Sequence, residues 1–129
     1  MYMVAFMYPN AEGAVFDFEH FVNVHLPLGV GLTDQHLHLK PRKIVIYSPT
    51  RGGDGRPGSA PYITISSVFF DSREAAETFA GLFNVEDAAR RLAADFPNYT
   101  PAAPEIMLAE VTEITDIDAL VRAFREMKD

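Results

Sequence analysis

Cysteine is absent from the 129 residues of this chain. Disulfides, thiolate nucleophiles and cysteine-ligated metals are therefore excluded, and we expect a cytoplasmic protein. Basic residues are also few, with 11 Lys and Arg against 18 Asp and Glu and a formal net charge of -7. Nucleic-acid binding requires basic side chains that replace phosphate counterions, so this charge balance excludes a nucleic-acid partner.

Long apolar segments are missing as well. The apolar residues 1–8 are too short to span a bilayer and lack the basic start of a signal peptide, so we expect no membrane partner. A length of 129 residues, 48% of them hydrophobic, fits a single domain over residues 1–129. Tryptophan is absent, but 10 Phe and 5 Tyr suit a dense core or a pocket for a flat apolar ligand.

Four runs of β-branched and aromatic residues predict strands. They lie at residues 2–8, 43–47, 62–70 and 106–114. Between the second and third runs, residues 49–61 carry many glycines and prolines, which predict a long hairpin connection.

Helical spacing predicts three helical regions around these strands. The first ends or breaks at Pro27, because the residue before a proline disfavours the α conformation. The second is capped by Asp71-Ser72 and interrupted at Asn84, and the third is a terminal helix capped by Thr115 or Asp116. The order β-α-β-β-α-β plus a helix predicts an α+β, ferredoxin-like fold with a four-stranded antiparallel sheet.

The strands indicate that this sheet is covered on both faces. Helices cover one face of such a sheet, yet residues 2–8 and 43–47 are apolar on both sides. An exposed apolar patch of that size is unusual in a monomer, so we expect a homodimer formed through the second face. The terminal helix could cross to the partner or close its own subunit.

One histidine, His25, stands among apolar residues of the first helical region. Histidine exchanges a proton near neutral pH, so His25 is a candidate general acid or base. A break at Pro27 would place it beside loose backbone carbonyls, and the alternative interpretation is a core-edge histidine bonded to one of them. At helical spacing His25 shares the core-facing side with Phe18, Phe21, Val22 and Leu26, whereas Glu19, His20 and Asn23 point outward, where His20 could contact a partner.

Two groups of polar side chains could complete a ligand site around His25. Tyr8 and Tyr47 lie on predicted strands, where their hydroxyls could reach a ligand oxygen or simply reach water. Asn98 and Tyr99 could close one end of the pocket. The alternative is a rigid loop that satisfies its own amides, which is the interpretation we favour for Asp95.

The histidines His36 and His38 precede the second strand. In extended conformation they would point the same way, but a metal site needs a third ligand and Asp34 is the only candidate nearby. We therefore expect a solvated loop and no metal.

Two segments together resemble a known family. After an opening strand, Phe16-Asp17 and then His25-Leu26-Pro27-Leu28 resemble the start of the EthD family, within the dimeric α+β barrel superfamily. The later segment Asp95-Phe96-Pro97-Asn98-Tyr99-Thr100 resembles the acidic, Pro-Asn-aromatic segment before the last strand of that family. The resemblance covers residues 1–115 and implies a ferredoxin-like chain that pairs into a dimeric barrel.

The resemblance also implies a range of functions. Family members are similar to cofactor-independent isomerases, decarboxylases and monooxygenases of small oxygenated metabolites, or have a part in ether degradation. We expect such an enzyme, without cofactor, acting on a small cyclic or aromatic molecule. The alternatives are a non-catalytic binding protein of a degradation pathway and a haem protein, since relatives in the wider superfamily hold haem through a histidine in the same cavity. In the enzyme hypothesis His25 moves a proton and the substrate-binding residues are Tyr47, Tyr99, Asn98, Phe21 and Tyr8.

Overall fold

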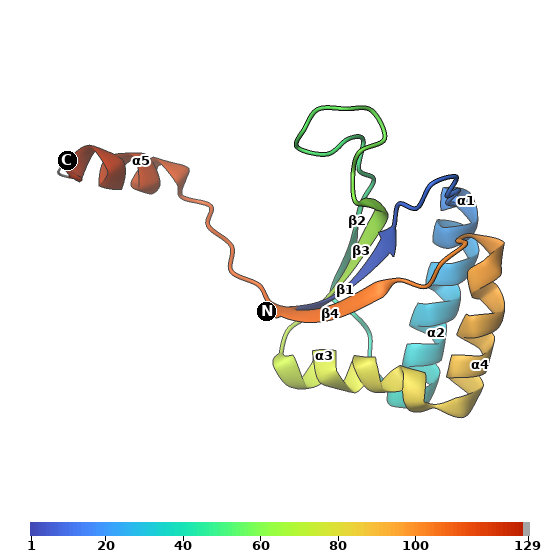
Figure 1. The fold of residues 1–129 in the computed structure, drawn as a ribbon. Coiled ribbons are helices and arrows are strands. Elements are labelled where there is room, and N and C mark those ends of the chain that lie inside the picture. The colour runs from blue at the N-terminus through green and yellow to red at the C-terminus, as the bar shows by residue number, and fades with distance from the viewer. Residues whose placement is uncertain (128–129) are drawn as a thin grey trace.

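The computed structural model describes residues 1–127, in which a four-stranded antiparallel sheet carries helices on one face (Figure 1). The sheet order is β2-β3-β1-β4, and every neighbouring pair is antiparallel. The α+β, ferredoxin-like fold predicted from the sequence is confirmed. The strands are β1 (Tyr2–Pro9), β2 (Lys43–Tyr47), β3 (Tyr62–Phe70) and β4 (Glu105–Glu110).

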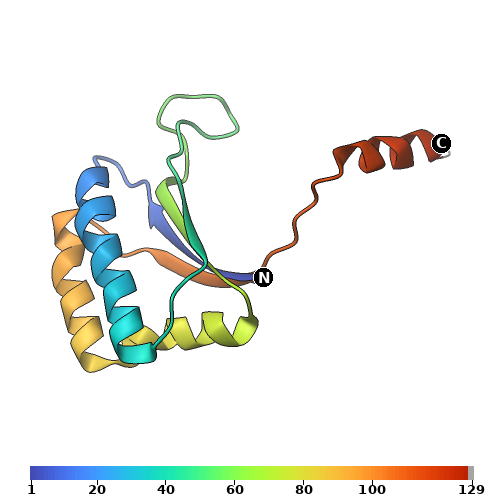
Figure 2. The ribbon, with the colours of Figure 1, turned by 180° about the vertical axis from the view of Figure 1, so that it is seen from behind.

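The helices α1 to α4 all lie on the same side of the sheet, and α2 and α4 run side by side (Figures 1 and 2). As predicted, Ser72 caps α3 by accepting a hydrogen bond from the Ala75 N–H, and a 3-10 turn ending at Asn84 interrupts the second helical region. No helix within residues 1–127 is long and apolar enough to cross a membrane. The helices are α1 (Phe18–His20), α2 (Leu26–Leu37), α3 (Arg73–Ala80), α4 (Glu86–Asp95) and α5 (Ile117–Glu126).

The first helical region runs through Pro27, so the predicted break is wrong. Its middle, Phe21–His25, is a π turn in which the Leu26 N–H donates to the Phe21 carbonyl five residues earlier. Proline is costly in an α-helix because its ring crowds the carbonyl four residues back and it supplies no N–H. The wider turn directly before Pro27 relaxes this crowding, and α2 continues to Leu37. His25 therefore lies inside a continuous helix and not beside loose carbonyls.

The last strand is shorter than predicted, and the terminal helix α5 lies after it. β4 ends at Glu110, before the predicted end at Ile114, and Asp116 caps α5 by accepting a hydrogen bond from the Ala119 N–H. Within residues 1–127, α5 lies apart from the sheet and the other helices (Figure 1), so it does not close its own subunit. Its apolar stripe is exposed and consists of Ile117, Leu120, Val121, Phe124 and Met127.

Alternation along the strands gives the sheet two different faces. The helix-covered face contributes Val4, Val68 and Phe70, which pack with Phe79 of α3. The other face, here called the open face, has no helix over it in the described part of the chain (Figures 1 and 2). By strand register its apolar side chains are Met3, Ala5, Met7, Val45, Tyr47, Ile65, Phe69, Met107 and Ala109.

Candidate functional site

Three buried rings meet between the sheet and the first helical region. Tyr8 of β1, Phe21 of the π turn and Tyr99, here called the aromatic cluster, have centroids 5.2 to 5.8 Å apart. The His25 ring stacks on Phe21 with 5.6 Å between centroids and lies 4.5 Å from the Tyr99 ring. Only 9% of His25 is exposed, so this imidazole faces the interior.

The Asp95 carboxylate, at the C-terminal end of α4, holds His25 from one side. Its Oδ2 atom accepts a hydrogen bond from His25 Nδ1 at 3.0 Å. Its Oδ1 atom accepts from His20 Nε2 at 2.8 Å and from Asn98 Nδ2 at 3.1 Å. The carboxylate thereby sets the imidazole tautomer, with the proton on Nδ1. The interpretation of Asp95 as a residue that serves only its own loop is wrong.

The π turn explains why His20 joins this site although it was expected to point outward. In an α-helix, residues five apart are separated by about 140° around the axis. The hydrogen bond from Leu26 back to Phe21 spans five residues and brings positions five apart to the same side. His20 and His25 therefore reach the two oxygens of one carboxylate, and Phe18 is turned out, with 47% of its surface exposed.

The second imidazole nitrogen belongs to a chain of hydroxyl groups. Because Nδ1 carries the proton, Nε2 of neutral His25 is an acceptor, and the Tyr99 hydroxyl donates to it at 3.1 Å. The Tyr8 hydroxyl lies 3.2 Å from the Tyr99 hydroxyl and can donate to it in turn. Tyr8, Tyr99, His25 and Asp95 thus form a continuous hydrogen-bonded relay, whose two phenols and imidazole are buried.

The environment fixes the protonation state of each member of the relay. Burial lowers the pKa of His25, although the hydrogen bond to Asp95 opposes this shift. Burial alone would raise the pKa of Asp95, but hydrogen bonds from His20, Asn98 and His25 lower it on balance. Burial raises the pKa of Tyr8 to about 12 and raises the pKa of Tyr99 as well. At neutral pH the site therefore holds a neutral base between a carboxylate and neutral phenols.

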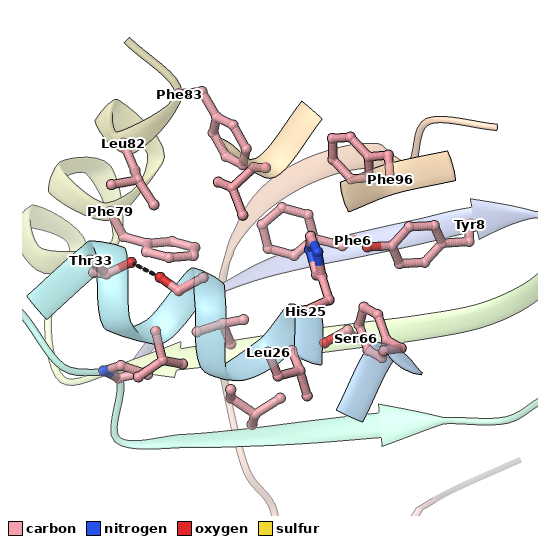
Figure 3. Close-up of a pocket in the computed structure, with 17 residues that line it drawn as sticks. Phe6, Tyr8, His25, Leu26, Thr33, Ser66, Phe79, Leu82, Phe83 and Phe96 are labelled. Carbon is pink, nitrogen blue, oxygen red and sulfur yellow. Dashed lines mark hydrogen bonds between the residues drawn. The ribbon is translucent and has the colours of Figure 1, made fainter. Parts of the chain in front are cut away.

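A cavity of about 60 Å³ adjoins this relay, between the helix-covered face of the sheet and α2 (Figure 3). The His25 ring and the Tyr8 hydroxyl border one end of it (Figure 3). The rest of the wall is apolar except for Thr33, whose hydroxyl donates to the Gly29 carbonyl at 2.7 Å, and Ser66. Aliphatic and aromatic side chains complete the wall, among them Phe6, Leu26, Phe79, Leu82, Phe83 and Phe96.

Comparison by sequence finds no matching family model and no matching curated protein. Comparison by structure finds an EthD-like protein from Ralstonia eutropha JMP134, 22% identical, covering 90% of this chain and 96% of that one with a TM-score of 0.66. It also finds a protein of the ethyl tert-butyl ether (EthD) family from Bacillus halodurans C-125, 16% identical, covering 87% and 99% with a TM-score of 0.58.

The chain has an EthD-like fold. The likeness extends over almost the whole of both solved chains, and at these identities it concerns the fold alone. It confirms the ferredoxin-like fold of the single chain that the two sequence segments implied.

Within this EthD-like fold, the structure places the predicted site residues unequally. Phe21, Tyr8 and Tyr99 surround His25, and Asn98 contacts it indirectly, through Asp95. Tyr47 does not belong to this group, because strand alternation places it on the open face, where 51% of it is exposed. The prediction that Tyr47 orients a ligand beside His25 is therefore wrong.

The loop predicted for the two other histidines is wrong for His36, which is helical, whereas His38 is exposed just after the helix. His36 lies in the last turn of α2, where its Nε2 atom is 3.3 Å from Asp87 Oδ2, and His38 caps the helix in left-handed conformation. They are not extended, so they do not point the same way. Residues 1–127 contain no group of three side chains arranged to hold a metal ion.

Haem does not fit the site that the EthD-like fold provides here. A cavity of about 60 Å³ is far smaller than a porphyrin requires. Both ring nitrogens of His25 are also engaged, by Asp95 and by Tyr99, so neither is free for iron.

Two polar residues of the site, Asp95 and Ser66, are not predicted by the sequence patterns. Asp95 begins the segment that contains Asn98 and Tyr99, and this position was the available signal for it. Ser66 belongs to a predicted strand. It alternates with Val68 and Phe70 on the helix-covered face, and a small polar residue in such a row was the available signal.

Proposed function

We propose that this chain belongs to the EthD family and is a small cofactor-independent enzyme in which His25 transfers a proton on an oxygenated cyclic molecule. The observation that carries the proposal is that His25 borders the cavity while Asp95 fixes its tautomer. A neutral imidazole held in this way is a competent general base. The isomerase, decarboxylase and monooxygenase reactions considered for the fold all include such a proton transfer.

The relay supplies the acid partner for this base. When a ligand displaces the Tyr99 hydroxyl from Nε2, that nitrogen can remove a proton from the ligand. The Tyr8 hydroxyl, which also borders the cavity, can then donate to the ligand oxygen on which negative charge develops. The high pKa of both phenols keeps them protonated and able to donate.

Proton exchange in D₂O tests this proposal directly. Wild-type protein should accelerate exchange of the protons next to the carbonyl of cyclopentanone, and His25→Gln should reduce the acceleration at least ~100-fold, since general bases contribute about 10² to 10⁴. Because burial lowers the pKa of His25, the rate should stay level from pH 8 to about 6.5, the ordinary histidine value, and fall only below it. NMR signal loss at the α-carbon measures the rate.

His36→Gln is the matched control, since His36 also bonds an aspartate of α4 but lies outside the cavity. It should exchange cyclopentanone protons at the wild-type rate. Equal rates for wild type and His25→Gln would refute the catalytic role.

A second candidate function is non-catalytic binding, and one observation favours it. The Nε2 atom of His25 is already paired with Tyr99, so the site as it stands has no free base. Cyclopentanone binding that survives His25→Gln, with no exchange in either protein, would select this alternative.

We further propose that the protein is a homodimer joined through the open face. That face exposes apolar side chains, including Tyr47 and Met107, at 51% and 44%, and α5 presents a second exposed apolar stripe. Pairing two copies would cover the open faces and allow α5 to pack on the partner, removing a patch that is unusual for a monomer.

The substitution Met107→Glu should convert the dimer into a monomer, because two carboxylates would be buried against an apolar face. Sedimentation equilibrium measures the mass. The control is Val15→Glu, which adds the same charge at a residue that is 75% exposed and outside the sheet, and it should remain dimeric. A wild-type monomer at high concentration would contradict the proposal.

A further inference from the structure

The Ser66 hydroxyl is an unpaired polar group in an apolar cavity. Ser66 is 1% exposed, and its Oγ atom is the only buried side-chain nitrogen or oxygen in residues 1–127 that lacks a hydrogen-bond partner. Burying a hydroxyl without a hydrogen-bond partner is unfavourable, and native proteins rarely contain such an unpaired buried hydroxyl. This hydroxyl lies on the sheet side of the cavity that His25 borders (Figure 3).

No side chain next to Ser66 pairs with it. In the sheet register it stands between Phe6 of β1 and Ile46 of β2, and its neighbours on the same face of β3 are Val68 and Thr64. Thr64 alone among these four can donate or accept a hydrogen bond, and it does not pair with the Ser66 hydroxyl. A molecule inside the cavity can supply the missing partner.

We propose that Ser66 is the specificity-determining residue of the site and donates a hydrogen bond to the single oxygen of an uncharged ligand. This inference rests on the proposed function and names its substrate class, a small cyclic ketone or phenol. The ligand is uncharged because His25 is the only titratable side chain besides Tyr8 on the cavity wall, and burial keeps both neutral at pH 7. Its apolar body lies against the rings and aliphatic chains of the wall, such as Phe6 and Leu82.

The size of the cavity limits the ligand further. A cavity of about 150 Å³ admits benzene, and this one measures about 60 Å³. Even a five-membered ring requires side chains to move, and Phe83 is the candidate because it lines the cavity and is only partly buried. Serine at position 66 keeps space free that a larger residue on this face of the strand would fill.

A matched pair of probes, cyclopentanone and cyclopentane, tests the role of the hydroxyl. The two rings have the same size and differ in one oxygen. Ser66→Ala should weaken cyclopentanone binding about 10-fold, as expected for the loss of one buried hydrogen bond, and leave cyclopentane binding unchanged. Backbone amide NMR titration measures both affinities and shows whether the shifts fall on cavity residues.

Ser67→Ala is the matched control, because Ser67 is the next residue of β3 and lies on the open face. It should bind both probes like the wild type. Ser66→Ala should fold with an unchanged or higher melting temperature, since it removes an unpaired buried hydroxyl.

The inference is overturned if Ser66→Ala binds cyclopentanone as tightly as the wild type does. It is also overturned if the wild type does not bind cyclopentanone, or binds it without shifts at the cavity, in which case the hydroxyl bonds only water. Ser66-dependent binding without proton exchange would refute the proposed catalysis and leave this inference intact. Proton exchange that is the same in Ser66→Ala and in the wild type would refute this inference and leave the proposed catalysis intact.

Discussion

Asp95→Ala should lower the free energy of unfolding by about 1 to 3 kcal/mol, the cost of leaving a buried hydrogen-bond donor without its partner. The Asp95 carboxylate is 8% exposed and accepts hydrogen bonds from His20, His25 and Asn98. Its removal leaves the Nδ1–H of His25 buried without an acceptor and frees α4 from the first helical region. Urea denaturation followed by circular dichroism measures the change.

Asp87→Ala provides a control of the same chemistry on the same helix. Asp87 also contacts a histidine, His36, at 3.3 Å, but the Asp87 side chain is 43% exposed. An exposed contact of this kind contributes little to stability, so the variant should be nearly as stable as the wild type. Equal losses for Asp95→Ala and Asp87→Ala would mean that the Asp95 contacts do not hold the site together.

Phe21→Ala should be more severe, with a loss of about 3 to 5 kcal/mol. Phe21 is 1% exposed, stacks on His25 and contacts both tyrosines of the aromatic cluster. Truncation would open a void at the centre of that cluster, because the rings around it come from different elements and cannot all close in. The midpoint of urea unfolding at an unchanged slope gives the loss.

Phe18→Ala distinguishes the π turn from an uninterrupted α-helix. An α-helix would place Phe18 on the core face together with His25, and its truncation would then cost as much as that of Phe21. In the structure Phe18 is 47% exposed, so Phe18→Ala should change stability by less than about 1 kcal/mol. A loss equal to that of Phe21→Ala would contradict the turn.

The fold was predictable because its signals are local. The run 62–70 is β-branched and aromatic except at Ser66 and Ser67, and β3 covers Tyr62–Phe70. The Ser72 cap and the interruption at Asn84 depend on neighbouring residues only. The wrong end of the last strand has a physical reason, since past Glu110 the apolar pattern continues without a neighbouring strand to pair with.

The site was less predictable because its contacts join distant parts of the chain. Asp95 and His25 are separated by 70 residues, and no spacing rule connects them. The alternation of side chains along a strand shows which residues share a face of the sheet, but not which face the helices cover. The sequence alone therefore could not place Tyr47 on the open face. The π turn leaves no mark in the apolar periodicity, and the proline that follows it is typical of a helix end as well.

The same turn lets the site tolerate a chain that is one residue shorter. A π turn holds one residue more than an α turn, so deleting one residue between Phe21 and His25 would still permit a continuous helix. The two histidines would then be four residues apart, a spacing that places side chains on one face of an α-helix. His20 and His25 could therefore both still reach Asp95, whereas the same deletion in a regular α-helix would turn them apart by about 100°.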